Sequence, residues 1–233
     1  MRYLCTAKPQ NGTLAEWLGN GLQNRVQQFD SARYLPESPR LRAFLITMDL
    51  RLILSRHIGL RDIEAVCAEC RRSGDVALTK MLCGLTDDSD DRVAYNAMWI
   101  LTHLWKDGDN RLLAMRDILI DQVLHTSHTG RRRMALTLLL HIPFDKNTLR
   151  TDYLDYCLAG ISSAEPYGVR ALCMKQMLEF CRIFPELTPE LLCALDMMDS
   201  GDISPGLAAA RRNVLAAITR EPRLNVYNAR SHR

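Results

Sequence analysis

The chain repeats itself at a fixed 38-residue interval. Val93, Arg131, Val169 and Leu207 are separated by this interval, and each begins an apolar pattern that is typical of a helix. Apolar residues recur at further equivalent positions of this helix and of the helix that follows it: Ala97, Ala135 and Cys173; Leu101, Leu139, Met177 and Leu215; Met115, Tyr153 and Leu191; Leu119, Cys157 and Leu195. Two short helices cannot bury their apolar faces alone, so successive pairs stack to form a continuous core. The repeat therefore predicts an α-solenoid.

The spacing of apolar residues is helical along almost the whole chain. They recur at intervals of three and four, and strict alternation is rare, so the sequence predicts an all-α fold. We expect about eleven helices, near residues 13–27, 39–55, 60–72, 75–85, 91–105, 110–125, 130–142, 148–161, 166–184, 189–199 and 205–219. Helix starts carry cap signals at Thr13 with Glu16, Ser38-Pro39, Thr188-Pro189 and Ser204-Pro205. Two Asp-rich stretches, 86–91 and 106–110, are predicted to form turns.

Composition narrows the class of protein. With 47% apolar and 24% charged residues, 12 glycines and 9 prolines, the chain can bury a core, which excludes disordered and collagen-like classes. No uncharged apolar run approaches the roughly 18 to 20 residues of a membrane helix, and no signal peptide is evident, so we expect a cytoplasmic protein without a membrane partner. The eight cysteines are expected to be reduced core residues. We expect one solenoid domain over 1–219, with clear repeats from about residue 75, and a basic, flexible tail over 220–233.

Two helix starts carry a family resemblance. Val169 and Arg170 with Cys173, and Val93 with Ala97, follow the pattern Val-Arg-x-x-Ala, the second of them after an Asp-rich turn. This pattern resembles the HEAT/armadillo class of helical repeats. The resemblance implies a right-handed superhelix of helix pairs, with the Val-Arg helix lining its concave side.

Other positions depart from that family pattern. Ala94 stands where the family has Arg, Arg131 where it has Val, and Arg211 where it has a small residue. The part of the chain before residue 75 does not keep the 38-residue phase. A compact, irregular helical bundle is the alternative architecture.

The basic residues are unevenly distributed between the two helices of each unit. The formal net charge is only +3, which does not by itself indicate a nucleic-acid binder. The first helices nevertheless carry a net +6 and the second helices a net −4. The charged residues of the first helices are the basic Arg92, Arg131, Arg132, Arg133, Arg170, Lys175, Arg211 and Arg212 and the acidic Asp91 and Glu179. Those of the second helices are the basic Arg111, Arg116 and Arg150 and the acidic Asp117, Asp121, Asp152, Asp155, Glu190, Asp196 and Asp199. A surface of one sign steers ligands of the opposite sign, so the first helices favour an anionic partner.

Arginine makes up 25 of the 30 basic residues, which suits contacts with carboxylate or phosphate but also fits a base-rich genome. Arg132 and Arg170 match the family position at which arginines form a ladder with acidic residues of the adjoining turn, and we expect that structural role for both. Arg133, Lys175 and Arg212 lie outside the matched position and are predicted to be available to a partner.

Aromatic and histidine side chains add a second feature to the first helices. Trp99 follows Tyr95 by four positions, at a place in the repeat that is polar in the other units. It is therefore either an exposed anchor for a partner or a core residue that fills a gap. His103 and His141 are also separated by the 38-residue interval and are expected to stack. Such a pair can bind metal or sense pH, although polar spots at helix ends are the commoner explanation.

Other motifs are weak. Cys67 and Cys70 have the spacing of a zinc knuckle or redox pair, and His125 and His128 have a similar spacing, but no second ligand pair follows at metal-site distance. The common phosphate-loop, dinucleotide, zinc-protease and serine-hydrolase motifs are absent from the sequence. We therefore expect no cofactor and no metal.

One enzyme class invites comparison, the HEAT-like DNA glycosylases that remove alkylated bases. They use aromatic residues, a carboxylate and basic residues in a groove, and this chain offers Trp99, Trp105, Asp107 and Arg133. No family motif surrounds these residues, and Asp107 lies in a predicted turn.

The sequence thus favours a non-catalytic scaffold that binds an acidic protein segment or helix. The predicted binding surface consists of Arg92, Tyr95, Trp99, His103, Arg133, His141, Lys175 and Arg212. The alternative is nucleic-acid binding on the same surface, with DNA alkylation repair as its enzymatic form.

Overall fold

The structure, a computed structural model, describes residues 50–73, 76–105, 113–198 and 204–225. The chain divides into two compact units, Met1–Ile53 and Leu54–Arg233. Of the first unit only residues 50–53 are described, and they are helical. The helix predicted near 13–27, the cap signals at Thr13 and Ser38, and the turn at 106–110 lie outside the described residues. One continuous domain over 1–219 stays a prediction.

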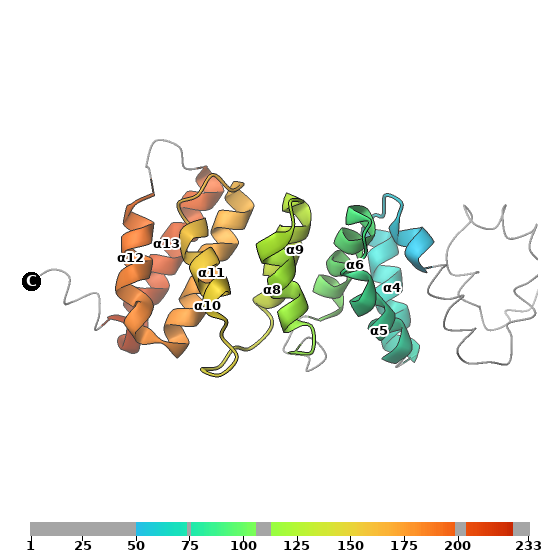
Figure 1. The fold of residues 1–233 in the computed structure, drawn as a ribbon, viewed down its shortest axis with the longest axis horizontal. Coiled ribbons are helices and arrows are strands. Elements are labelled where there is room, and N and C mark those ends of the chain that lie inside the picture. Colours follow the sequence, from blue (N-terminus) through green and yellow to red (C-terminus); the bar gives the residue numbers. More distant parts are fainter. Residues whose placement is uncertain (1–49, 74–75, 106–112, 199–203, 226–233) are drawn as a thin grey trace, which may run out of the picture. The chain divides into compact units, whose positions relative to one another are not determined.

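The described part of the second unit is built from helices without strands (Figure 1). The helices are α4 (Leu60–Ser73), α5 (Val76–Leu85), α6 (Asp91–Leu104), α8 (Arg116–His125), α9 (Thr129–Leu139), α10 (Thr151–Gly160), α11 (Tyr167–Ile183), the 3-10 helix η2 (Pro185–Leu187), α12 (Thr188–Asp196) and α13 (Pro205–Arg220). The all-α prediction is confirmed for these residues. Over the same ranges, no helix combines the length and the apolar character that crossing a membrane requires.

The helices of the second unit form two layers. α6 packs against α9, α9 against α11, and α11 against α13, while α10 packs against both α8 and α12. The layers are joined within the pairs α8 with α9 and α10 with α11. We call α4, α6, α9, α11 and α13 the first layer, and α5, α8, α10 and α12 the second layer. This is the predicted stacking of helix pairs; the hand of a superhelix and the choice of concave layer stay predictions.

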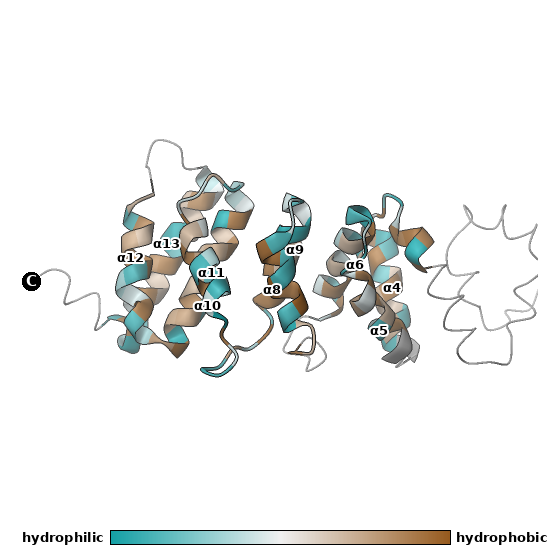
Figure 2. Ribbon diagram, in the orientation of Figure 1, coloured by the Kyte–Doolittle hydropathy of each residue, from teal (hydrophilic) through white to brown (hydrophobic). Residues whose placement is uncertain are grey.

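The residues that keep the 38-residue phase form the core of these layers. Val93, Arg131, Val169 and Leu207 are at most 9% exposed, and the small residues Ala97, Ala135 and Cys173 are fully buried. Figure 2 shows apolar and polar faces on the same helices, as expected for amphipathic helices that pack on one side. Leu215 on α13 is the exception, since it is only half-buried.

An aromatic cluster packs between the two layers at α10 and α11. Tyr153 and Phe180 are fully buried, with ring centroids 5.6 Å apart at an interplanar angle of 84°. Phe144 stacks on Tyr153 at 6.0 Å and meets Phe180 edge-on at 5.4 Å. Edge-to-face and stacked pairs of this kind contribute beyond their buried area, so this cluster is a centre of stability.

Polar side chains fix where several helices begin. Asp90 accepts a hydrogen bond from the backbone N–H of Arg92 at 2.9 Å, and Ser204 accepts one from Leu207 at 3.2 Å. The prediction that Ser204 caps a helix is therefore confirmed, as is the turn role of residues 86–91. The expectation for Thr188 is wrong. The helical turn η2 runs directly into α12, so Thr188 is its first helical residue and makes no side-chain cap.

The repeat also extends further toward the N-terminus than the 38-residue phase indicates. α4 packs against α6, and its buried Ile63 and Cys67 precede Val93 and Ala97 by a 30-residue offset. The unit that contains α4 and α5 is therefore shorter, which shifts the phase without changing the packing. Cys67 and Cys70 are buried core residues of this unit and are not disulfide-bonded.

The packed chain continues past residue 219. Glu221 forms an ion pair with Arg182 of α11 at 2.6 Å, and residues 222–225 form a further helical turn in which Leu224 is 1% exposed. The remainder of the predicted tail, 226–233, lies outside the described residues.

Candidate partner-binding face

One side of α6 carries four residues that are exposed or half-buried: Arg92, Tyr95, Trp99 and His103. The residues between them are mostly buried. Among the equivalent positions of α9 and α11 are Arg133 and Lys175, both exposed. We call the surface formed by these six residues the first-layer face.

The α6 part of this face is an aromatic ridge. Tyr95, Trp99 and His103 follow one another at intervals of four, so they share one side of the helix. The ring centroids of Tyr95 and Trp99 are 6.1 Å apart, and those of Trp99 and His103 are 6.3 Å apart. The Nδ1 atom of His103 lies 3.0 Å from the carbonyl oxygen of Trp99. Trp99 is half-buried, so one part of its ring packs within the ridge and the other part is open to solvent.

Arg133 links this ridge to α9. Its Nη2 donates to the hydroxyl oxygen of Tyr95 over 3.4 Å, across the boundary between two repeat units. The guanidinium group is exposed, and within the described ranges it has no carboxylate partner. Tyr95 and Arg133 are themselves separated by the 38-residue interval, so one repeat position supplies both side chains.

Glycines of the neighbouring helices lie close to these two side chains. A Cβ atom at Gly130 would lie 2.8 Å from the His128 ring and 3.3 Å from the Tyr95 ring, and one at Gly168 would lie 3.4 Å from Cδ of Arg133. Gly130, Gly168 and Gly206 follow one another at the same 38-residue interval. At Gly206 a Cβ atom would meet nothing within 4 Å, and the side chain that would reach it, at the position of Tyr95 and Arg133, is the short Ala171.

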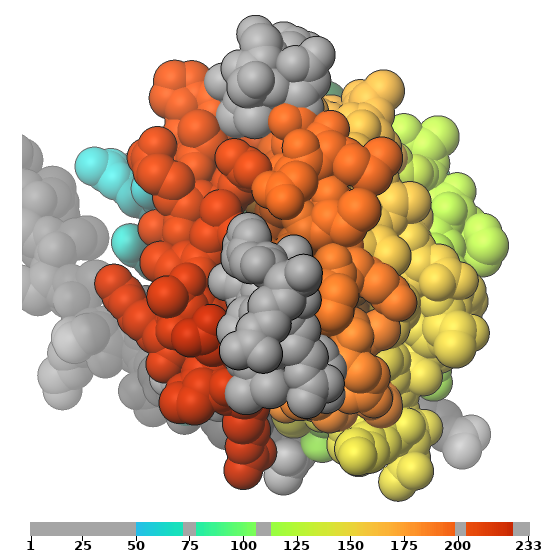
Figure 3. Space-filling model, turned by 90° about the vertical axis from the view of Figure 1, so that its left-hand side faces the viewer, coloured from blue at the N-terminus to red at the C-terminus, as the bar shows by residue number. Residues whose placement is uncertain are grey.

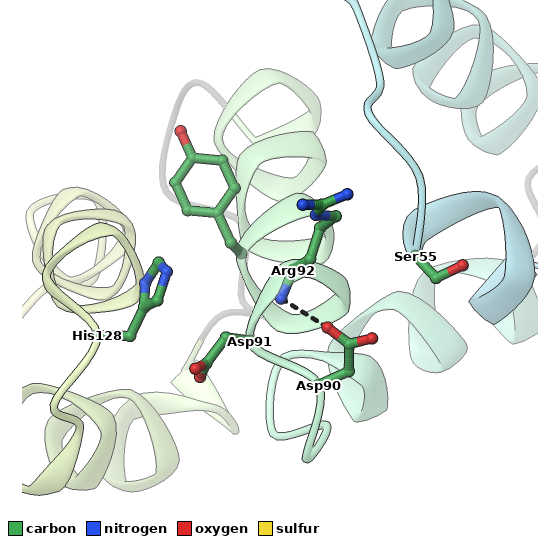
Figure 4. A pocket seen from close by; sticks show the side chains of 6 residues that line it. Ser55, Asp90, Asp91, Arg92 and His128 are labelled. Carbon is green, nitrogen blue, oxygen red and sulfur yellow. Dashed lines mark hydrogen bonds between the residues drawn. The ribbon is translucent and has the colours of Figure 1, made fainter.

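An open cavity of about 640 Å³ adjoins the face where α6 and α9 begin (Figure 4). It is lined by Ser55, Asp90, Asp91, Arg92, Tyr95 and His128. Its two carboxylates already have partners, since Asp90 caps α6 and Asp91 pairs with Arg131 at 2.8 Å. The side chain of Arg92 remains exposed, but Asp90 keeps its negative charge when it caps the helix, so the cavity carries no excess of positive charge.

Comparison with known protein families decides the fold family. A model of the HEAT repeat domain matches residues 50–218, which is more than half of the chain. The chain belongs to the HEAT repeat family. No curated protein and no solved structure matches the chain. The family assignment confirms the resemblance seen in the Val-Arg helix starts.

Of the eight first-helix cations named from the sequence, half make contacts inside the HEAT repeat stack. Arg132 pairs with Glu165 at 2.6 Å and Arg131 pairs with Asp91, which supports the ladder predicted for Arg132. A second, regular contact was not predicted: side chains of the first layer donate to carbonyl oxygens at the end of the preceding second-layer helix. These contacts are Arg132 Nε to Val123 O at 3.1 Å, Arg170 Nε to Ile161 O at 2.9 Å and Arg211 Nε to Leu195 O at 2.9 Å. They satisfy carbonyl groups that have no partner within their own helix.

Arg211 explains its own departure from the family pattern. Ala208 stands at the position of Arg132 and Arg170, and Arg211 lies one turn further along the same side of α13. It reaches the carbonyl oxygen of Leu195 and pairs with Asp196 at 3.1 Å. The arginine has moved forward by one turn in the repeat, and the carbonyl group that it reaches has moved back by one turn, because Leu195 is equivalent to Cys157 whereas Arg170 reaches Ile161.

Arg212 is exposed, but it occupies a position that differs from those of the face. Its equivalents Met98, Leu136 and Met174 are buried where the next unit stacks. Arg212 therefore belongs to the side of α13 that points along the stack. Figure 3 looks at this end of the second unit, where α12 and α13 lie in front. His141 follows the end of α9 in a turn and is half-buried, and the ring contacts of His103 are made within α6.

The structure gives several weaker candidates structural roles. Trp105 is 2% exposed and does not offer its ring to a nucleotide, while Asp107 lies outside the described residues. Nδ1 of His128 accepts the backbone N–H of Arg131 at 3.1 Å and so caps α9. Across the described ranges no cluster of three or more His, Cys, Asp or Glu residues is arranged to hold a metal ion.

The buried thiols are not poised for chemistry. Burial raises the pKa of Cys181 to about 12, and it also raises the pKa of Cys157, which lies beside Cys173. The reactive form of cysteine is the thiolate, so these side chains stay protonated and inert at neutral pH.

Proposed function

We propose that this HEAT repeat protein is a non-catalytic interaction module of the cytoplasm that binds an acidic protein segment or helix on the first-layer face. One observation carries the proposal: an aromatic ridge and three cations without a carboxylate partner in the described chain, Arg92, Arg133 and Lys175, share one solvent-facing side of α6, α9 and α11.

The chemistry of the face is that of an interface with a central anchor. Rigid aromatic and arginine side chains provide most of the binding energy at protein interfaces, especially where neighbouring groups exclude water. Trp99 is flanked by Tyr95 and His103, and a tryptophan side chain has few rotatable bonds, so little conformational entropy is lost when a partner covers it. The cations on either side add steering and select an acidic partner.

The face is large enough for such a partner. Neighbouring helices in a layer lie roughly 8 to 10 Å apart, so α6, α9 and α11 together span about 20 Å. A helix rises about 1.5 Å per residue, so a partner helix of three to four turns covers this distance.

Nucleic-acid binding fits the face less well. A protein that grips a phosphate backbone typically neutralises several phosphates in a row. Arg131, Arg132, Arg170 and Arg211 are engaged in internal contacts, which leaves three cations on the first-layer face. The burial of Trp105 further weakens the glycosylase alternative.

A binding experiment with a defined probe tests the proposal. The probe is a fluorescent helical peptide about four turns long, with glutamate and leucine on one side. It is titrated with the full chain at about 50 mM and about 200 mM salt. We expect Arg133→Glu with Lys175→Glu to weaken binding more than tenfold, and adding Trp99→Ala to weaken it by about a further thirtyfold, which corresponds to about 2 kcal/mol.

The matched control is Arg212→Glu with Arg220→Glu, which makes the same change in net charge on two exposed residues of α13. It is expected to leave the affinity within about twofold, and both double variants should unfold within about 0.5 kcal/mol of the parent. Equal losses in both double variants would show that net charge alone drives binding. Tighter binding of a 20-nucleotide DNA with a steep salt dependence would instead favour the nucleic-acid alternative.

A further inference from the structure

We propose that Tyr95 and Arg133 together form a carboxylate-binding site, and that Trp99 beside them seats an apolar side chain. The partner is then a helix that carries an acidic residue one turn away from an apolar residue. This inference rests on the proposed function and specifies the chemistry of the partner at that face.

The donors of the two side chains converge. Because the Tyr95 oxygen accepts from Arg133, the hydroxyl hydrogen of Tyr95 is left to donate elsewhere. The guanidinium group keeps further N–H donors in a planar fork that matches the two oxygens of a carboxylate. The 3.4 Å distance between Nη2 and the hydroxyl is long for a hydrogen bond, so a carboxylate that accepts from both groups replaces a weak contact with two charge-assisted ones.

The site is held in place from below. A Cβ atom added at Gly130 would lie 3.3 Å from the ring of Tyr95 and 2.8 Å from the ring of His128, and one added at Gly168 would lie 3.4 Å from Cδ of Arg133. The Tyr95 ring thus lies close to the backbone of α9, and the stem of Arg133 lies at van der Waals distance from a side chain added on α11. This preorganisation lowers the entropy that binding has to overcome.

The site occurs once in the described repeats. The equivalent position after Arg133 is Ala171 and the next is Ala209, neither of which can donate to a carboxylate. The part of the first-layer face on α6 and α9 thus binds a single acidic residue. Lys175 contributes positive charge but is not part of this pair of converging donors.

The position of Trp99 sets the spacing of the partner residues. Its ring centroid lies 6.1 Å from that of Tyr95, close to the rise of one helical turn. A partner helix presents residues i and i+4 at a similar separation on one side. A glutamate at i and a leucine at i+4 therefore match Tyr95 with Arg133 and Trp99.

Two helical peptides of identical composition test the spacing on the full chain. The first has glutamate at i and leucine at i+4, and the second has leucine at i+2, so that the two side chains lie on different sides of the helix. We expect the first to bind at least tenfold more tightly. Arg133→Lys and Tyr95→Phe are expected to weaken binding of the first peptide about tenfold and about threefold, since each keeps the charge of the protein and removes donors of the site.

Arg212→Lys is the matched control, because it makes the same exchange at an exposed arginine outside the face. It should leave the affinity unchanged. If either site variant fails to fold, as judged by circular dichroism, the comparison of the two peptides on the parent protein still decides the spacing.

The outcomes separate the two proposals. Equal binding of both peptides, or full affinity in Arg133→Lys and Tyr95→Phe, overturns the carboxylate site, while the charge-reversal and Trp99→Ala losses would keep the face as the binding surface. Preferential binding of a 20-nucleotide DNA over both peptides overturns the carboxylate site and the acidic protein partner together.

Discussion

The helices α9 and α13 occupy the same place in different units of the first layer, yet they hold their neighbours differently. In α9 the contact comes from Arg132, which donates to Val123 O and pairs with Glu165 in a half-buried setting. In α13 the equivalent residue is Ala208, and Arg211 makes the corresponding contact from one turn further along. The repeat therefore keeps an arginine contact to the end of the preceding second-layer helix, although both the arginine and the carbonyl group that it reaches differ in repeat position.

The difference follows from what packs on each helix. α11 stacks on α9, so the residues of α9 on that side are apolar and buried, such as Leu136. Within the described chain no helix stacks on the far side of α13, and the same position there is the exposed Arg212. Capping units of repeat proteins have polar outer faces for this reason. The neighbour, rather than the repeat register alone, decides whether a position is apolar.

Truncation should expose this difference most strongly. Ending the chain after residue 164 removes α11 and uncovers Tyr153 and Leu136, both fully buried. We expect this fragment to aggregate or to lose cooperative unfolding, because large apolar surfaces then face solvent. Ending it after residue 203 removes α13 and the helical turn at 222–225, and it should leave a folded protein of lower stability. Thermal unfolding with light scattering measures both, and a fragment ending at 164 that unfolds as cooperatively as the parent would contradict the stacked-repeat architecture.

The two arginine contacts should differ in their contribution to stability. Replacing Arg132 by methionine removes the cation that pairs with Glu165, whose side chain is only 20% exposed and keeps a 3.3 Å hydrogen bond from the Tyr156 hydroxyl, so we expect a loss of about 3 kcal/mol in the free energy of unfolding. Arg211→Met removes a pair whose Asp196 is 78% exposed, so the loss there should be about 1 kcal/mol. Urea denaturation of both variants gives the comparison. Equal losses would mean that the carbonyl contacts, which both arginines share, dominate the energetics.

The close packing of α10 on α11 offers a third comparison. A Cβ atom at Gly160 would lie 2.8 Å from Sγ of the buried Cys173, so Gly160→Ala should cost about 2 kcal/mol although alanine favours helices. Adding Cys173→Ala removes the sulfur and should recover part of the loss. The equivalent pair of the last unit is Met198 and Arg211, whose larger side chains do not allow so close an approach.

Gly206→Ala is the control for this substitution, because a Cβ atom there meets nothing within 4 Å. It should leave stability unchanged or raise it by up to about 1 kcal/mol. Stability that does not fall in Gly160→Ala would show that α10 and α11 can move apart at little cost.

Much of the fold can be predicted from the sequence, because stacking in a repeat protein imposes the same burial on equivalent positions. Ala97, Ala135 and Cys173 are all buried as their phase indicates. The unit that contains α4 is shorter, so the 38-residue phase does not include it. A 30-residue offset between Ile63 and Val93 would have located this unit. The role of Arg211 depends on the reach of a side chain to a neighbouring carbonyl group, which spacing alone does not give.

The candidate site was predictable only in part. The spacing of the aromatic residues on α6 indicates the ridge around Trp99. Arg133 does not occupy the repeat position at which arginines form the ladder, which indicates that it does not take part in the ladder. The contact of Arg133 with Tyr95 joins two units, and the Tyr95 ring also lies close to Gly130 of the neighbouring helix. The three glycines at a 38-residue interval are a sequence signal that could have indicated this close approach. The side of α13 on which Arg212 lies could not be predicted in this way, because it depends on which equivalent residues are buried between stacked units.

The smallest expected effect concerns the link between the end of α13 and α11. The guanidinium group of Arg182 donates to the carboxylate of Glu221 and holds the pKa of that carboxyl below its ordinary value of 4.5. A carboxyl group whose pKa is lowered by folding stabilises the folded state fully above its unfolded pKa, and this contribution is lost as the pH falls through the folded pKa.

Both partners are partly exposed, so Glu221→Gln should lower the free energy of unfolding at pH 7 by less than about 1 kcal/mol, and the difference from the parent should vanish in the acid range below 4.5. Glu186→Gln, at an exposed glutamate of η2, is the control for the loss of one negative charge and should leave the free energy of unfolding at pH 7 unchanged. A loss in Glu221→Gln that persists unchanged at acid pH would mean that α13 is held by apolar contacts such as that of Leu224 and that the ion pair contributes nothing to the end of the stack.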